Sequence, residues 1–338
     1  MADGMTMMAG KAGGPHAAGT SPRAPFAGEP GVLVVDKPGG VSSAVITARV
    51  KSVLALRKIG HTGTLDPFAT GVLVLCLNEA TRVADQFINL GKAYLASLRF
   101  GEETDTLDRT GTVVRTSGLV FSREDLVEAI DSFRGPCLQK VPRFSAVKVG
   151  GQRLYKLSRK GIEVEQPERE VCIHSIELRS FDWPEAVIAV SCSKGTYIRQ
   201  LAADIGRKLG SGAHLSALRR VGVGPFDVES ALSMDELWAQ SPGSGFVPTA
   251  MARERVLRAI VPLNDALSHL PSTVVVEEQV LVMLRHGHLD PVWERSKAGG
   301  FSEYSGAVRI VTEAGRLAAL WWPNAEGSGS RRLRVFPF

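Results

Sequence analysis

The chain has 338 residues, of which 44% are hydrophobic and 22% charged, and its formal net charge is +5. This balance is typical of a folded globular protein and excludes a fibrous or largely disordered chain. No apolar run approaches the length that crosses a bilayer, so we expect no membrane association. The moderate positive charge favours a polyanionic partner without requiring one. Four widely spaced cysteines without a C-x-x-C pair predict reduced core residues and a cytoplasmic protein.

Three parts are predicted along the chain. Residues 1–30 are rich in Ala, Gly and Pro and carry no targeting pattern, which predicts a disordered tail. Residues 31–250 are predicted to form a catalytic domain, and the Ser, Pro and Gly content of 238–250 suggests a loop or linker at its end. Residues 251–338 are predicted to be a linker and a small β domain, because apolar runs at 308–311 and 317–322 flank a turn and 332–338 could close a β-barrel.

Within the large part, strand and helix patterns alternate irregularly. A short buried strand at 31–35 ends in a turn, and a helix capped by Ser42 or Ser43 follows, with an apolar face that repeats at helical spacing. A glycine-rich loop at 60–67 then leads into an apolar strand at 71–77. Further strands are predicted at 93–100 and 186–192, and further helices at 123–133 and 197–209. This mixed order predicts an α+β fold.

The loop Gly60-His61-Thr62-Gly63-Thr64-Leu65-Asp66-Pro67 is the first candidate for chemistry. Its glycines permit close approach of the backbone, and Pro67 keeps Asp66 out of the helical region. The carboxylate is therefore presented on a stiff turn, as a reactive group requires. The alternative is that Asp66 and Thr64 only cap and close the turn, which most Asp-Pro turns do.

A second candidate is the hexapeptide Lys194-Gly195-Thr196-Tyr197-Ile198-Arg199, which follows a strand and opens a helix. If Arg199 meets Asp66, its guanidinium would lower the pKa of the carboxyl by about 1 to 3 units and keep it ionised. An ionised carboxylate can act as a nucleophile. The alternative is an amphipathic helix with Arg199 on the solvated face and Tyr197 packed at its rim.

Residues 134–160, the basic segment, contain no Asp or Glu. Phe144 and Tyr155 are interleaved among its cations, so the segment could neutralise phosphates while aromatic rings stack on unpaired bases. A solvated charged surface is the alternative. The cations are Arg134, Lys140, Arg143, Lys148, Arg153, Lys156, Arg159 and Lys160.

No metal site or cofactor is predicted. The acidic segment 105–111 lacks the spacing of a calcium loop and its terminal glutamate. The scattered histidines and cysteines form no zinc pattern, and neither a phosphate-binding Walker loop nor a dinucleotide fingerprint is present.

Taken together, four stretches resemble the TruB family of tRNA pseudouridine synthases, and the resemblance spans about residues 31 to 226. They are Asp36-Lys37-Pro38 with Ser42-Ser43, Gly60 through Gly71, Lys194 through Arg199, and Gly212 through Arg220. The resemblance implies a pseudouridine-synthase fold, with a mixed central β-sheet and flanking helices. By position and strand pattern, the C-terminal part resembles the family's PUA-type RNA-binding domain. The chain departs from the family at residues 139–146, where two consecutive prolines are usual.

The resemblance also implies roles for single residues. Asp66 corresponds to the family's nucleophile, and Arg199 to its ion-pair partner. His61 would help to displace the target nucleotide, Tyr94 would stack on the uracil, and the remaining two contacts to the substrate fall on Tyr197 and Leu218. Lys140, Arg143, Lys148 and Arg153 are candidates for contacts to the RNA backbone.

The implied reaction is conversion of uridine 55 in the T-loop of tRNA to pseudouridine, by a monomer without guide RNA. Two other functions compete with it. A non-catalytic RNA-binding or RNA-folding protein would explain the basic segment, and an aspartate-dependent hydrolase would explain Asp66 but not the basic segment.

Overall fold

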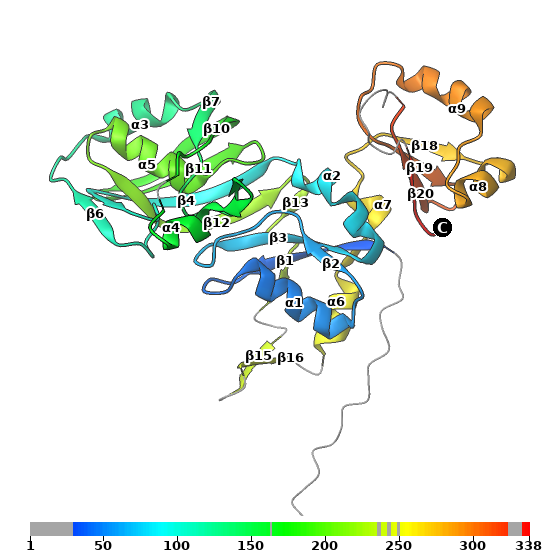
Figure 1. Ribbon diagram of the computed structural model, residues 1–338, viewed down its shortest axis with the longest axis horizontal. Helices are drawn as coiled ribbons and strands as arrows, with labels where there is room; N and C mark the ends of the chain where they lie inside the picture. Colours follow the sequence, from blue (N-terminus) through cyan, green and yellow to red (C-terminus); the bar gives the residue numbers. More distant parts are fainter. Residues whose placement is uncertain (1–29, 163, 235–237, 242–244, 249–250, 324–332) are drawn as a thin grey trace, which may run out of the picture.

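The computed structural model describes residues 30–162, 164–234, 238–241, 245–248, 251–323 and 333–338. The predicted tail, residues 1–30, lies outside the described residues except for Pro30. Within the described residues, eleven strands form one mixed sheet with the order β14-β1-β3-β12-β4-β11-β10-β7. Three short strands, β2, β13 and β17, pair with β3, β12 and β1 beside this path. Figure 1 labels β2 and β13 next to the main sheet. The strands are β1 (Gly31–Lys37), β2 (Ile59–His61), β3 (Thr70–Leu77), β4 (Lys92–Phe100), β7 (Gly135–Lys140), β10 (Glu168–Asp182), β11 (Glu185–Cys192), β12 (Ala213–Val223), β13 (Phe226–Asp227), β14 (Leu232–Ser233) and β17 (Ile260–Pro262).

The sheet is largely antiparallel, but β3 lies parallel to β12 at its centre. There Gly71 pairs with Arg220, which joins the half of the sheet that contains β1 and β3 to the half that contains β4, β11 and β10. The predicted α+β fold with a mixed sheet is confirmed.

Two groups of helices cover the sheet. Helix α1 (Ser43–Leu54) begins where predicted, because the Ser42 side chain accepts a hydrogen bond from the backbone of Val45. Its buried face packs on β1 and β3 together with α6 (Ala252–Arg258). Over the other half, α3 (Arg123–Asp131) and α5 (Ile198–Lys208) share one apolar cluster with β4 and β10 to β12.

Strand β1 is buried on both faces, which explains its continuous apolar sequence. Leu33 and Val35 face α1, whereas Val32 and Val34 face a second cluster that includes Leu317 of the C-terminal part. Strand β4 instead alternates between buried and more exposed residues, as expected when one face is covered.

The C-terminal part contains a four-stranded sheet with the order β18-β19-β20-β21, at one end of the molecule in Figure 1. The predicted hairpin is confirmed as β19 (Val308–Thr312) and β20 (Leu317–Trp321). Strand β21 (Leu333–Val335) pairs with β20, and β18 (Ser272–Val275), which the sequence analysis did not predict, lies parallel to β19. Residues 332–338 were expected to close a small barrel. Among the described residues β21 pairs with β20 and no pairing joins β21 to β18, so these four strands form an open sheet. Helices α8 (Glu278–Arg285) and α9 (Pro291–Ala298) complete this part.

The two parts share apolar contacts. Helix α7 (Leu263–Ala266) follows β17, which pairs with β1, so residues 252–266 pack on the large sheet. The predicted domain boundary between residues 250 and 251 remains a proposal. The start of the predicted linker, residues 252–266, packs on the catalytic part.

The interpretation of residues 238–250 as a loop is wrong for the described residues. Strands β15 (Trp238–Ser241) and β16 (Gly245–Pro248) pair as an antiparallel ribbon. Turn-forming residues between two β-prone segments favour a hairpin. The loop was predicted from the turn-forming residues alone, without regard to the segments on either side. Residues 242–244 and 249–250 lie outside the described residues.

Several other elements were not predicted from the sequence, among them the sheet strands β7, β10 and β12 and helices α6 to α9. The smaller ones are the ribbons β5 (Glu102–Thr104) with β6 (Val113–Thr116) and β8 (Lys148–Val149) with β9 (Gln152–Arg153), the helices α2 (Ala84–Ile88) and α4 (Leu154–Arg159), and the 3-10 turns at Asn78–Val83 and Gly299–Phe301. Among the described residues, no helix is long and apolar enough to span a membrane. All four cysteines are free, and Cys76 and Cys192 are buried.

Candidate active site

The loop that carries Asp66 lies between β2 and β3 and is clamped by the start of α1. Ser43 accepts a hydrogen bond from the backbone N–H of Leu65 at 2.9 Å and donates to the carbonyl of Leu65 at 3.1 Å. The Pro67 carbonyl accepts from the Gly40 N–H at 2.8 Å and from Lys37 Nζ at 3.3 Å. The backbone on both sides of Asp66 is therefore fixed by groups that the sequence places before the loop.

Arg199 meets Asp66 from the first turn of α5. Its Nε lies 2.9 Å from Oδ2 of Asp66, and its Nη2 lies 3.4 Å from Oδ1. The guanidinium also donates to the carbonyls of Thr106 at 2.8 Å and Phe144 at 3.0 Å. Only 5% of the Arg199 side chain is exposed, against 36% for Asp66. A buried guanidinium thus holds a carboxylate that remains open to a substrate.

The pKa of the Asp66 carboxyl shifts upward, whereas a contact with Arg199 was expected to lower it. Burial raises the pKa of the Asp66 carboxyl above its ordinary value, and this outweighs the lowering by the Arg199 guanidinium. The negative charge of Asp108 adds to the rise, and Lys37 opposes it. Because a third of the Asp66 side chain is still exposed, water moderates the rise.

Asp108 belongs to the acidic segment for which the sequence analysis found no function. Its side chain is buried, and its Oδ2 lies 3.8 Å from Nη1 of Arg199. Its Oδ1 accepts from the side chain of Thr106 at 2.9 Å and from the backbone of Thr110 at 2.9 Å. Asp108 therefore approaches a different nitrogen of Arg199 from the two that contact Asp66, and the sequence spacing gave no reason to expect this contact.

Tyr94 and Leu218 form an apolar wall beside the Asp66 loop. They come from neighbouring strands, where Ala96 pairs with Leu218, and both belong to the same buried cluster as Leu65. Each side chain is 8% exposed. Burial raises the pKa of the Tyr94 phenol, while the positive charge of Arg220 lowers it. The phenol is therefore a neutral, largely desolvated surface.

His61 lies on β2 at the start of the loop, half-buried, with its Nδ1 buried and without a hydrogen-bond partner. Burial lowers its pKa, and the charge of Arg220 lowers it further, so the ring is neutral at physiological pH.

Arg220 is a supporting residue that the sequence analysis did not single out. It is 3% exposed and donates to the carbonyl of Val72 at 2.7 Å and to the carbonyl of Gly63 at 2.9 Å. It thus ties β12 to both β3 and the Asp66 loop, and it pairs with Tyr94 in the sheet. Arg220 could have been identified from the sequence, because it ends the stretch Gly212 through Arg220, one of the four on which the family resemblance rests.

Tyr197 is half-buried at the start of α5, and the Arg169 guanidinium lies 5.4 Å from the centre of its ring. The side-chain amide of Gln139 makes two hydrogen bonds to the Tyr197 backbone. The structure therefore shows protein contacts on the backbone and on one face of the ring, and the role of Tyr197 in substrate contact remains a prediction.

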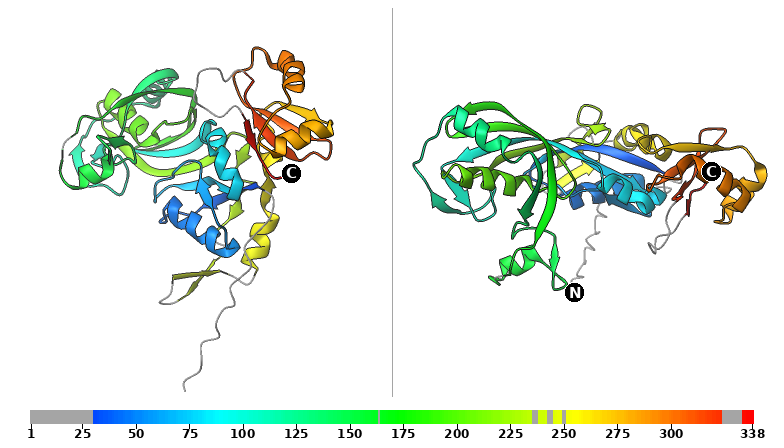
Figure 2. Two further views of the ribbon diagram at one scale, coloured as in Figure 1. Left: turned by 45° about the vertical axis from the view of Figure 1, so that its right-hand side comes forward. Right: turned by 90° about the horizontal axis from the view of Figure 1, so that it is seen from above.

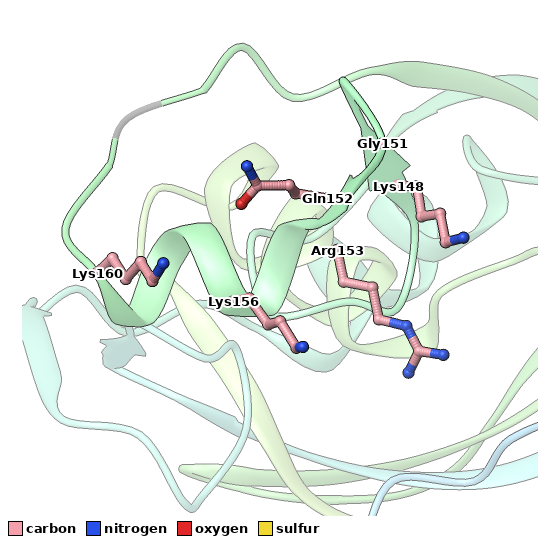
Figure 3. A pocket seen from close by; sticks show the side chains of 6 residues that line it. All are labelled: Lys148, Gly151, Gln152, Arg153, Lys156 and Lys160. Carbon is pink, nitrogen blue, oxygen red and sulfur yellow. The ribbon is translucent and has the colours of Figure 1, made fainter.

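Lys140, Arg143, Lys148 and Arg153 are all exposed. Lys148 and Arg153 pair across the β8–β9 ribbon, and together with the following helix they surround an open hollow of about 370 Å³. In Figure 3 the side chains of Arg153, from β9, and Lys156, from α4, point in the same general direction. The segment that carries this hollow projects from the body of the molecule (Figure 2). Gly151, Gln152, Lys156 and Lys160 also line it.

Comparison with known proteins connects this geometry to a family. Residues 51–198 match the TruB family pseudouridylate synthase (N terminal domain), and residues 199–268 match the tRNA pseudouridylate synthase B C-terminal domain. A curated relative from Syntrophobacter fumaroxidans, "tRNA pseudouridine synthase B", is 54% identical over 90% of this chain and 97% of its own length. The chain belongs to the TruB family. Its members are isomerases, and this chain is a pseudouridylate synthase by family.

Further comparisons agree with this TruB assignment. A relative of the same name from Pseudomonas paraeruginosa is 39% identical over 85% of this chain and 94% of its own length. Among solved structures, a Cbf5-Nop10-Gar1 complex contains a chain with a TM-score of 0.63 and 26% identity, covering 90% of this chain and 83% of that one. The predicted pseudouridine-synthase fold is confirmed.

Proposed function

We propose that this TruB-family enzyme converts uridine 55 in the T-loop of tRNA to pseudouridine, with Asp66 as the nucleophile. The observation that carries the proposal is the carboxylate of Asp66, open to solvent on one side and gripped by a buried arginine on the other. The names of the relatives support tRNA as the substrate class.

The reaction breaks the bond between the ribose and N1 of uracil and forms a bond between the same ribose carbon and C5, which then loses its hydrogen. All atoms of the substrate except that exchanged hydrogen are retained, so the chemistry requires no oxidant or reductant. An ionised Asp66 is a suitable nucleophile. Attack on the ribose carbon, attack on the base and abstraction of a ribose proton each remain compatible with the carboxylate's position.

The target nucleotide must leave the stack before it reaches Asp66. Extrusion costs on the order of a few kcal/mol, and stacking on an aromatic ring returns about 1 to 3 kcal/mol for each base. In this proposal the ring of Tyr94 stacks on the uracil and Leu218 supplies an apolar contact, and their shared cluster with Leu65 of the Asp66 loop supports these roles. His61, neutral and beside the loop, would occupy the space that the nucleotide leaves.

Contacts outside the pocket would hold the RNA. In this proposal the cations around the hollow at Lys148 and Arg153 neutralise phosphates, and their exposure on a projecting segment supports this role. We propose that the C-terminal sheet is a PUA-type RNA-binding domain, and that the protein acts as a monomer in the cytoplasm without guide RNA.

The test uses tRNA labelled with tritium at C5 of uracil. Wild-type protein should release tritium and produce pseudouridine at position 55, whereas Asp66→Asn should do neither while still binding tRNA. Asp227→Asn is the matched control, because Asp227 is exposed and its carboxylate bonds to the nearby residues Ser230 and Glu229. Release by Asp66→Asn at the wild-type rate would remove the assigned role. Salt-dependent tRNA binding by the wild type without any release would favour the non-catalytic RNA-binding alternative.

A further inference from the structure

Gln139 is buried beside the active site, although none of the steps above uses it. It lies in β7, within the basic segment, and is 3% exposed. Its Oε1 accepts the backbone N–H of Tyr197 at 2.8 Å, and its Nε2 donates to the carbonyl of Tyr197 at 3.0 Å. The side-chain amide of Gln139 thus bonds to both backbone polar groups of one residue, 58 positions away in sequence. These two hydrogen bonds together restrict the position and orientation of the Tyr197 backbone.

Tyr197 is the residue that precedes α5. Its backbone is extended, with φ −98° and ψ 107°, and no side chain caps the helix there. Arg199 follows two residues later, so the position of the Tyr197 backbone determines where the guanidinium starts. Because Arg199 reaches Asp66 with two nitrogens at once, a small displacement of the helix start would break at least one of these contacts.

The basic segment also contacts Arg199 directly. The carbonyl of Phe144, five residues after Gln139, accepts from Nη2 of Arg199 at 3.0 Å. Arg143 and Ser145, on either side of Phe144, are in turn bonded to α4, through the Ser158 hydroxyl at 3.0 Å and the Tyr155 N–H at 3.0 Å. The stretch 143–145 of the basic segment therefore bonds both to Arg199 and to α4.

We propose that Gln139 is a positioning residue of the reaction: it holds the start of α5 so that Arg199 contacts both oxygens of Asp66, and it joins this placement to the basic segment. The proposal rests on the function proposed above. Gln139 touches neither the reacting atoms nor the carboxylate, and it acts through Tyr197 and Arg199.

The test is the variant Gln139→Leu, which keeps the volume and removes both hydrogen bonds. Gln200→Leu is the matched control, since Gln200 is also 3% exposed, lies in α5, and bonds through its amide to Asp204 of the same helix. Single-turnover conversion of tRNA by Gln139→Leu should be about 10 to 100 times slower, the size of effect expected for a misplaced reactive group. Its Kd for tRNA should stay within about twofold of the wild type. Gln139→Glu keeps the acceptor for the Tyr197 N–H, so its single-turnover rate should lie between the rates of the wild type and Gln139→Leu.

The pH profile separates positioning from a loss of stability. The groups that face Asp66 are Arg199, Asp108, Lys37 and Tyr94, and Arg199 is the one that the change Gln139→Leu would displace. Because that guanidinium lowers the pKa of Asp66, the acid limb of the rate profile should move to higher pH in Gln139→Leu and stay in place in Gln200→Leu. A residue that served only stability would reduce the folded fraction without moving the limb.

The outcomes are distinct. If the wild type converts tRNA and Gln139→Leu matches it in rate and acid limb, the positioning role is wrong while the proposed function stands. If the wild type does not convert tRNA, the proposed function fails, and amide hydrogen exchange at residues 197–200 then decides the placement of α5. Faster exchange in Gln139→Leu than in Gln200→Leu would support the positioning role, and equal exchange would overturn it.

Discussion

Gly71 is a position at which one added methyl group should destabilise both the sheet and the site. It pairs with Arg220 at the parallel contact between β3 and β12, with φ +105°. A Cβ there would lie 2.1 Å from the carbonyl oxygen of Arg220 and 2.8 Å from its backbone N and C. These are backbone atoms, so no side-chain rotation relieves the overlap. For Gly71→Ala, we expect about 1 to 3 kcal/mol from the backbone conformation and a similar amount from the overlap.

The sum of about 2 to 6 kcal/mol is a large part of the 5 to 15 kcal/mol typical of a folded protein. Urea unfolding should show it directly, with Gly118→Ala as the control, because Gly118 is exposed and a Cβ there would meet nothing within 4 Å. The rate of pseudouridine formation should also fall, since displacement of β12 moves Arg220 away from the carbonyl of Gly63 in the Asp66 loop. A Gly71→Ala protein that unfolds within about 0.5 kcal/mol of the wild type, the usual range for a neutral surface change, would refute this reasoning.

Two further predictions concern charge. Burial lowers the pKa of Lys37 from 10.5 to about 8, so between these values the unfolded chain holds more protons than the folded one and stability rises with pH. The free energy of unfolding of the wild type, relative to Lys37→Met, should therefore rise from pH 8 to pH 10.5, by at most about 3 kcal/mol; a difference independent of pH in urea titrations would contradict this. Arg153→Ala should weaken tRNA binding and lower the slope of log K against log salt by about 1, with an unchanged rate at saturating tRNA. An unchanged slope would show that Arg153 contacts no phosphate.

Local patterns in the sequence were sufficient for much of the fold. The apolar run at 71–77 predicted β3, and the pair Ser42 and Ser43 predicted the start of α1, because strand burial and helix capping depend on neighbouring residues. The ribbon at 238–248 was missed because turn residues dominated the composition. Strand β18 was missed because its four residues offer too little pattern to distinguish a strand.

The site divides in the same way. Asp66 and Arg199 stand in specific motifs, and the expected contact between them is present across 133 residues. Asp108, Gln139 and Arg220 act through partners that only the folded chain brings together, such as the Gly63 carbonyl 157 residues from Arg220. The upward shift of the Asp66 pKa could not be predicted from the sequence either, since the burial that causes it depends on residues that only the fold brings together.

The apolar contact between the large sheet and the C-terminal part has a consequence for protein engineering. Leu317, Leu320 and Phe336 belong to the same buried cluster as Val32 and Val72 of the sheet. A chain cut after α7 would expose this face to water and favour aggregation, so the C-terminal part is unsuitable as an exchangeable module. A graft from a relative would have to carry its side of the contact with it, or have matching residues redesigned on β1 and β3.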